Sequence, residues 1–134
     1  MQLHRLDHVN LRTERVAVLR EFYSRVLGLV EGVRPPFAFP GAWMYLGDTP
    51  IVHLVEAQEP PTPPERPQLQ HFAISAEGLA DFLAHLRACR VGYRVGVVPG
   101  FGSYQVNIKD PDGNCLHVDF GAHEVADISP FAPA

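Results

Sequence analysis

The chain contains two copies of one sequence pattern, and this internal repeat limits its fold more than any other feature. Residues 6–11 (Leu-Asp-His-Val-Asn-Leu), which we interpret as a strand, align with residues 69–74 (Leu-Gln-His-Phe-Ala-Ile) at an offset of 63 positions, so that histidine falls on histidine. Further along, at an offset of 64 positions, His117 falls on His53. A repeat of this length predicts two similar supersecondary modules.

Each half also contains a helical pattern after its first strand. In residues 16–27, apolar side chains recur at steps of three and four until Gly28, and Thr13 is a candidate helix cap. Residues 79–88 show the same periodicity before Gly92 ends it. The predicted order of elements in each half is therefore a strand, a helix and three further strands.

The last predicted hairpin carries polar side chains on one face. Residues 110–114 (Asp-Pro-Asp-Gly-Asn) combine the proline, glycine and Asx residues of a tight turn. Beyond this turn, apolar residues alternate with His117 and Asp119 through residues 116–120. Because side chains alternate between the two faces of a strand, one face is apolar and the other carries an imidazole and a carboxylate. This polar face predicts a functional site.

A proline-rich segment separates the two halves. Five of the nine residues from Glu59 to Pro67 are prolines, which predicts a stiff and extended connector. We expect one domain, residues 1–134, that consists of module 1 (4–56), a linker (57–68), module 2 (69–120) and a short C-terminal tail (121–134).

Composition and charge exclude several classes of protein. A formal net charge of −4 and a pI near 5.9 argue against nucleic-acid binding. There is no apolar run of membrane-spanning length and no secretory signal pattern, so we expect a cytoplasmic protein with no membrane partner. Cys89 and Cys115 are the only cysteines and form no Cys-x-x-Cys pair, which argues against a disulfide framework and a sulfur-ligated zinc site.

Four histidines occupy repeat-matched positions: His8, His53, His71 and His117. One interpretation is that they are ordinary polar residues on exposed strand faces, since antiparallel sheets often keep one face in water. The other is that they bind a first-row transition metal, for which imidazole is a suitable ligand. Because these histidines recur at matched positions in both halves, we favour the interpretation that they bind a metal.

Two motifs give the chain a resemblance to a known family. Residues 22–29 (Phe-Tyr-x-x-Val-Leu-Gly-Leu) and the turn at 110–114, within paired modules, resemble the vicinal oxygen chelate superfamily. This group includes glyoxalase I, bleomycin-resistance proteins, fosfomycin-resistance thiol transferases and extradiol dioxygenases. The resemblance covers residues 4–120 and implies an α+β fold in which two tandem βαβββ modules form a curved mixed sheet around a concave metal site, with helices on the outer face. It also implies a homodimer with sites shared between chains.

The resemblance further implies a set of metal ligands. Glyoxalase I uses an early His or Gln, a late Glu, a second early His and a second late Glu, and the matching positions are His8, His53, His71 and His117. The bound ion would be divalent, with zinc, iron, nickel, manganese and cobalt all open. The late ligands are imidazoles here, not carboxylates, so four neutral ligands would leave the ion's charge at +2.

The same replacement removes the glutamate that serves glyoxalase I as general base. His117 is the candidate for proton transfer, although a metal-bound imidazole has no free lone pair on its ligating nitrogen. Asp119 lies on the same strand face and is a candidate substitute ligand or an acceptor for a ligand's N–H group. We therefore expect weak or absent glyoxalase I activity.

Four aromatic residues are candidates for the substrate pocket: Trp43, Tyr45, Phe101 and Tyr104. Aromatic residues on strands are also common in hydrophobic cores, so core and pocket both stay open for them. Three functions follow from the resemblance. They are a metal-dependent glyoxalase-like or dioxygenase-like enzyme whose small substrate chelates the metal through two oxygens, a metal-free binding protein like those for bleomycin, and a non-catalytic domain with a structural metal.

Overall fold

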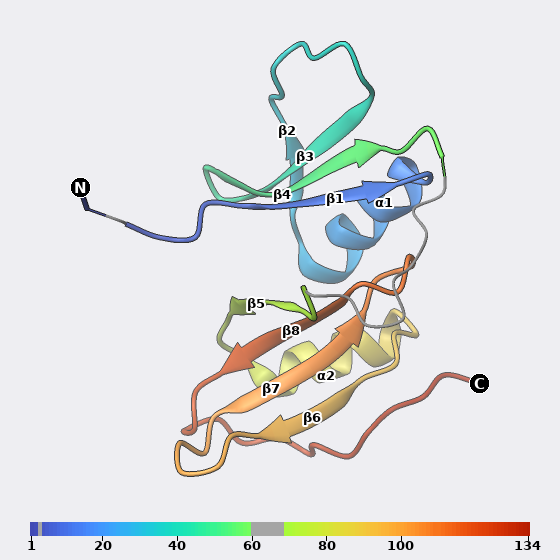
Figure 1. The fold of residues 1–134 in the computed structure, drawn as a ribbon. Helices are drawn as coiled ribbons and strands as arrows, with labels where there is room; N and C mark the ends of the chain where they lie inside the picture. The colour runs from blue at the N-terminus through green and yellow to red at the C-terminus, as the bar shows by residue number, and fades with distance from the viewer. Residues whose placement is uncertain (3, 60–68) are drawn as a thin grey trace. The chain divides into compact units, whose positions relative to one another are not determined.

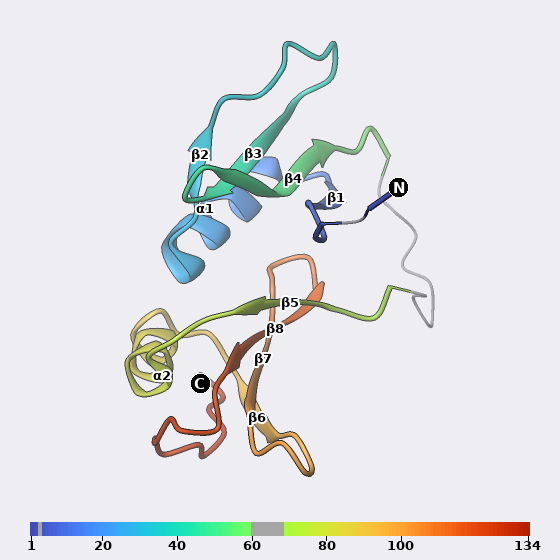
Figure 2. The ribbon, with the colours of Figure 1, turned by 90° about the vertical axis from the view of Figure 1, so that its left-hand side faces the viewer.

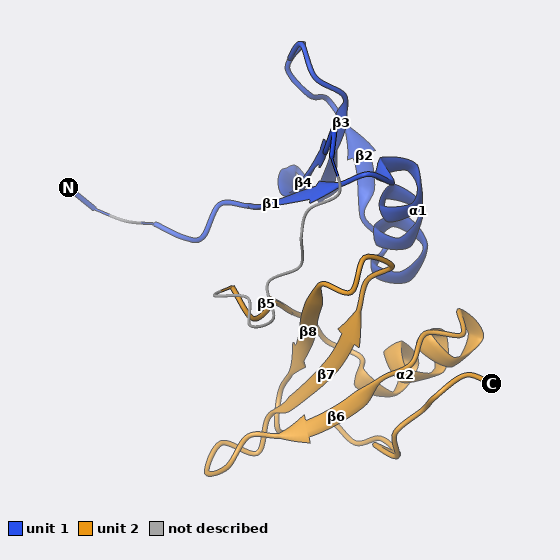
Figure 3. Cartoon of the chain, turned by 45° about the vertical axis from the view of Figure 1, so that its right-hand side comes forward, with its two compact units in different colours: residues 1–64 blue, residues 65–134 orange. Residues whose placement is uncertain are grey.

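The computed structural model describes residues 1–2, 4–59 and 69–134, so most of the predicted linker lies outside the described residues. The chain divides into two compact units, residues 1–64 and 65–134 (Figure 3). Each unit contains one helix and one four-stranded mixed sheet (Figure 1). The prediction of an α+β fold built from two tandem βαβββ modules is confirmed.

Unit 1 follows the predicted order of elements. They are β1 (Val9–Thr13), α1 (Val16–Leu27), β2 (Val30–Gly32), β3 (Gly41–Leu46) and β4 (Thr49–Glu56). The strands are arranged in the order β1-β4-β3-β2, with β1 parallel to β4 and the other pairs antiparallel.

Unit 2 repeats this topology. Its elements are β5 (Phe72–Ser75), α2 (Leu79–Ala88), β6 (Arg94–Val97), β7 (Tyr104–Lys109) and β8 (Cys115–Phe120). The order β5-β8-β7-β6 matches that of unit 1, and β5 is again parallel to β8.

Each helix covers one face of its own sheet (Figure 2). In unit 1, Leu19 and Tyr23 of α1 are fully buried, as are Val52 and Leu54 of β4. Because strand residues alternate between faces, His53 lies on the face of β4 opposite α1. Because α1 covers one face of the sheet, only side chains on the opposite face are available for a functional site.

The start of module 1 differs from the prediction in two details. The first strand begins at Val9 and not at Leu6, whose side chain is 78% exposed. Thr13 does not cap α1 as predicted, because it is a buried residue of β1 and the capping position is Arg15. The Thr13 hydroxyl instead accepts a hydrogen bond from the Arg15 backbone N–H at 2.9 Å, which shapes the turn into the helix.

The predicted turn at residues 110–114 is organised by its first residue. The buried Asp110 carboxylate accepts hydrogen bonds from the backbone N–H groups of Asp112 and Asn114 and from the Asn114 side chain. Gly113 adopts a φ of 85°, which favours glycine. This turn places the first residue of β8 beside the last residue of β7.

The C-terminal tail is attached to unit 2 at both of its ends. Near its start, the Glu124 carboxylate accepts hydrogen bonds from the backbone N–H groups of Gly78 and Leu79 and so caps α2. Near its end, Phe131 forms an antiparallel bridge with Tyr93, directly before β6. No helix in the described parts of the chain has the length and hydrophobicity needed to span a bilayer.

Candidate functional site

In unit 1, His8 and His53 lie together on the sheet face opposite α1. Their ring centroids are 3.8 Å apart and their planes are 13° from parallel. Trp43 stacks on the other side of His53, with centroids 4.0 Å apart and an angle of 11° between planes. His53 is thus held between two rings and only 8% exposed.

In unit 2, the matched pair His71 and His117 also lies together. The ring centroids are 4.4 Å apart and the planes are tilted by 44°. His117 is 6% exposed, and its Nδ1 atom lies 2.5 Å from Oδ1 of Asp119. The carboxylate predicted on this strand face therefore contacts the histidine directly.

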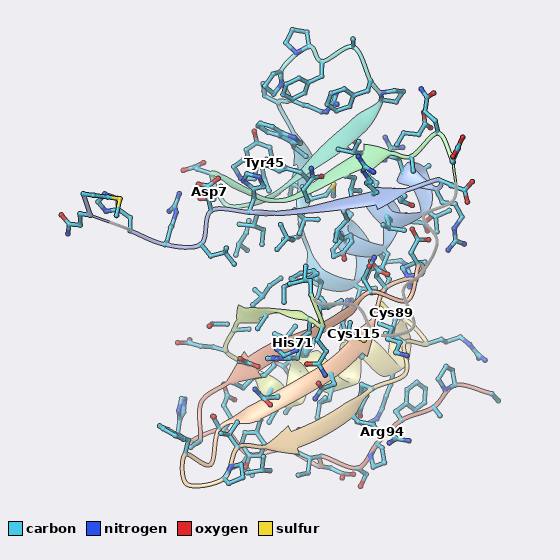
Figure 4. All side chains as sticks on the ribbon, viewed as in Figure 1. Asp7, Tyr45, His71, Cys89, Arg94 and Cys115 are labelled. Carbon is cyan, nitrogen blue, oxygen red and sulfur yellow. The ribbon has the colours of Figure 1, made fainter. Side chains whose placement is uncertain are left out.

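The two early histidines share a second feature, which is a side-chain oxygen on the preceding residue. Nδ1 of His8 lies 2.8 Å from Oδ2 of Asp7, and Nδ1 of His71 lies 2.9 Å from Oε1 of Gln70. Asp7 and Gln70 are themselves repeat-matched, and Figure 4 shows Asp7 on the segment that leads into β1 and His71 at the start of β5. Both acceptors require Nδ1 to carry the proton.

His53 has a buried nitrogen with no hydrogen-bond partner among the described residues, which is Nε2. Burial lowers the pKa of His53, and the neighbouring charge of His8 lowers it further. At neutral pH, His53 is therefore a neutral imidazole.

The hydrogen-bonding pattern is the same at three of the four histidines. Nδ1 of His8, His71 and His117 is engaged by a carboxylate or an amide, and Nε2 is the nitrogen left for another partner. His53 likewise has a buried Nε2 with no hydrogen-bond partner among the described residues. Metal-binding histidines typically donate their second N–H in this way, which fixes the tautomer and the ring orientation. The donor chemistry therefore fits a transition metal.

The orientation of one ring has to change before it can bind a metal. A metal ion lies in the plane of a ligating imidazole, about 2.1 Å from its nitrogen. The planes of His8 and His53 are nearly parallel, so one ion cannot lie in both of them. His8, whose side chain is 39% exposed, must therefore rotate before both rings can bind the same ion. Within the described residues, no three His, Cys, Asp or Glu side chains form a metal-binding cluster.

The four aromatic pocket candidates lie in different environments. Trp43 contacts His53, whereas the Tyr45 hydroxyl donates to the Val33 backbone carbonyl at 2.6 Å. Tyr104 alternates with the buried Val106 and Ile108 and so lies on the α2 side of its strand, away from the face of His117. Phe101 lies in the loop between β6 and β7 and is 79% exposed.

The sequence analysis did not identify Asp7 and Gln70 as partners of the histidines. The signal was present, because both directly precede a histidine at matched positions of the repeat.

Comparisons with known proteins agree with this architecture. A family model described as Glyoxalase/Bleomycin resistance protein/Dioxygenase superfamily matches residues 5–118. "Glyoxylase I 4" of Arabidopsis thaliana is 28% identical over 125 residues, which are 88% of this chain and 71% of that protein.

Solved structures support the fold at lower identity. The glyoxylase/bleomycin resistance protein/dioxygenase domain from Frankia sp. EAN1pec is 20% identical with a TM-score of 0.75, and the match covers 92% of this chain and 96% of that one. The fosfomycin resistance protein FosX from Listeria monocytogenes is 10% identical with a TM-score of 0.68, covering 90% and 95%. The family-model match spans most of the chain, and the protein therefore belongs to the glyoxalase/bleomycin resistance protein/dioxygenase superfamily.

Proposed function

We propose that the protein is a metal-dependent enzyme whose small substrate binds a divalent metal through two oxygens. The proposed metal ligands are the Nε2 atoms of His8, His53, His71 and His117. This proposal is supported by the engagement of Nδ1 at His8, His71 and His117, which leaves Nε2, and by the buried Nε2 of His53, which has no hydrogen-bond partner among the described residues. Such an enzyme is proposed to be a cytoplasmic homodimer with sites shared between chains.

The chain's own residues hold and orient the ligands. Asp119 fixes the His117 ring, Asp7 and Gln70 do the same for the early histidines, and Trp43 packs against His53 and excludes water from it. When bound, a divalent ion with four neutral ligands would supply a +2 charge that stabilises an enolate, alkoxide or similar oxyanion. The resulting reaction is of the lyase, isomerase, dioxygenase or thiol-transfer type.

His117 is assigned to the metal and not to proton transfer. Its Nδ1 atom is engaged by Asp119, and the proposed ligand role uses the only other ring nitrogen. The observed hydrogen bond supports Asp119 as the acceptor for the His117 N–H rather than as a substitute ligand. With His117 bound to the metal, proton transfer in the reaction would depend on another group.

The test is elemental analysis of protein purified without chelators or an affinity tag that binds metal. We expect about one equivalent of a transition metal per chain in the parent protein, and a large loss in both His53→Ala and His117→Ala. His123→Ala, an exposed histidine in the tail, is the matched control and should keep the metal. Parent protein that neither contains nor takes up metal would overturn the proposal.

A second candidate is a metal-free binding protein of the bleomycin-resistance type. The stacked rings of His8, His53 and Trp43 favour it, because they already pack closely without an ion. Metal content separates the two candidates, since a binding protein of this type should retain its ligand affinity after complete metal removal.

A further inference from the structure

An unbroken row of aromatic rings runs through unit 1, from an exposed loop to the candidate site. Phe37 and Phe39 stack on each other with centroids 5.1 Å apart, and Phe37 also contacts Trp43 at 6.3 Å. Trp43 in turn stacks on His53. Phe37 and Phe39 remain 46% and 42% exposed, so their packing against each other leaves a substantial apolar surface in water.

A positive charge is fixed beside this exposed surface. The Arg34 guanidinium carbon lies 5.0 Å from the ring centroid of Phe37 and 5.0 Å from that of Phe39. One of its nitrogens donates to the Phe39 backbone carbonyl at 2.8 Å, which holds the side chain in place. Within the parts of the chain that the structure describes, no carboxylate forms an ion pair with Arg34. The charge is therefore oriented but not neutralised.

A second, independent observation at the His53 end of the aromatic row also indicates a ligand. The His53 side chain is more than nine-tenths buried, and its Nε2 atom has no hydrogen-bond partner within the described part of the chain. A buried polar nitrogen without a partner is costly, so native structures usually satisfy it with a ligand, an ion or water. The aromatic row thus connects an exposed cationic surface with a nitrogen that requires a partner.

We propose that Arg34, Phe37, Phe39 and Trp43 form a subsite for a planar aromatic anion. The ligand's ring packs against the exposed phenyl rings, and its anionic group pairs with the Arg34 guanidinium, which is suited to both stacking and carboxylate binding. This inference deepens the proposed function by assigning an aromatic, negatively charged substrate to the same site. The aromatic contacts themselves need no metal.

The experiment uses metal-free full-length protein and the NMR signal of the single tryptophan indole N–H group, which reports on Trp43 alone. The probes are 2-naphthoate, the neutral 2-naphthylmethanol and the non-aromatic cyclohexanecarboxylate. We expect 2-naphthoate to shift the indole signal and to bind about tenfold more tightly than either comparator. Equal affinity for 2-naphthoate and either comparator, or no shift at all, would overturn the proposal.

Variants separate the contribution of charge from that of the rings. Arg34→Gln should abolish the preference for 2-naphthoate over the alcohol. Phe37→Ala should lower the affinity for both aromatic probes by roughly three- to tenfold. Val33→Ala, which changes an 84% exposed side chain on the same loop, should leave every affinity unchanged. Parent-like binding by both test variants would refute the subsite. If Arg34→Gln does not fold, the comparison of probes in the parent protein still decides the requirement for charge.

Metal content distinguishes failure of this inference from failure of the proposed function. Phe37→Ala should contain as much metal as the parent protein, because Phe37 supplies no ligand. A protein that binds metal but not 2-naphthoate would refute the subsite alone. One that binds 2-naphthoate but no metal would refute the metal-dependent function alone.

Discussion

Nδ1 of His117 lies 2.5 Å from Oδ1 of Asp119, and both residues belong to β8 with side chains on the same face. Because a carboxylate only accepts hydrogen bonds, Nδ1 carries the proton and Nε2 presents its lone pair. His53, at the matched position of unit 1, is held instead between the rings of His8 and Trp43. The two late histidines are therefore supported in different ways.

Removal of the Asp119 carboxylate should weaken metal binding without abolishing it. We expect Asp119→Ala to lower metal affinity by about 10- to 100-fold, which is the usual effect of losing a partner that orients a metal-binding histidine. Competition with a chromogenic chelator measures this change. Ser75→Ala is the control, because Ser75 is the register partner of Asp119 across β5 and β8, whereas the register partner of His117 is Ala73. An unchanged affinity in Asp119→Ala would show that Asp119 does not orient a ligand.

Glyoxalase I activity should be weak or absent. The positions where that enzyme's pattern has glutamates are His53 and His117 in this chain, and both are buried imidazoles. Neither offers a carboxylate for proton abstraction from the hemithioacetal of methylglyoxal. Robust turnover of that substrate by purified protein would show that another group supplies the base.

Much of this arrangement could be predicted from the sequence because it depends on periodicity. Alternation in the last strand placed His117 and Asp119 on one face, and the repeat matched His8 with His71 and His53 with His117 across the two modules. The contacts of His8 with His53 and of His71 with His117 within a module were not predicted, because they depend on the parallel pairing of β1 with β4 and of β5 with β8. The Tyr104 environment was also harder to predict, because its position opposite the histidine face depends on the register of β7 with β8.

Gly32 should not tolerate even a methyl group. A Cβ atom there would lie 2.6 Å from two ring atoms of Tyr45, whose hydroxyl is anchored to the Val33 carbonyl. Since the ring cannot move without losing that bond, we expect Gly32→Ala to lower the free energy of unfolding by about 1–3 kcal/mol. Gly96→Ala is the control, because the nearest atom to its added Cβ is 4.0 Å away. Equal stability of the two variants, measured by urea denaturation, would contradict the predicted clash.

The tail should stabilise unit 2 through its cap on α2. Glu124→Ala removes the acceptor for the backbone N–H groups of Gly78 and Leu79, and we expect a loss of about 1 kcal/mol of unfolding free energy. Glu59→Ala, a change of an exposed glutamate in unit 1, should have almost no effect. Thermal unfolding of both variants tests the cap, and an unchanged midpoint for Glu124→Ala would exclude it.

The pH dependence of metal affinity should report the number of imidazole ligands. Free histidine titrates near pH 6.5, so four imidazoles must lose their protons before a metal binds, and affinity should fall steeply from about pH 7 to 5. The limiting slope well below the imidazole pKa should approach about four protons per metal. Because burial lowers the pKa of His53, protons compete with the metal for this imidazole only at a lower pH than for a free histidine.

The lowered pKa of His53 also predicts how the stability of the metal-free protein depends on pH. The folded-state pKa of His53 lies below its unfolded value of 6.5, so its contribution to stability is present above pH 6.5 and is lost as pH falls through the folded-state pKa. Acid therefore weakens both the ligand set and the fold around it. Unfolding experiments on metal-free protein must accompany the affinity measurements, so that only folded protein is compared.

Replacing one imidazole with a carboxylate should reduce the slope. His71→Glu is the suitable variant, because His71 is exposed and its partner Gln70 is uncharged, whereas a glutamate at position 117 would face Asp119. Glutamate titrates near pH 4.3, so the variant should release about three protons per metal between pH 7 and 5. Chelator competition at a series of pH values measures both slopes. Identical slopes for the parent protein and His71→Glu would mean that His71 is no ligand and that the matched histidines serve some other purpose.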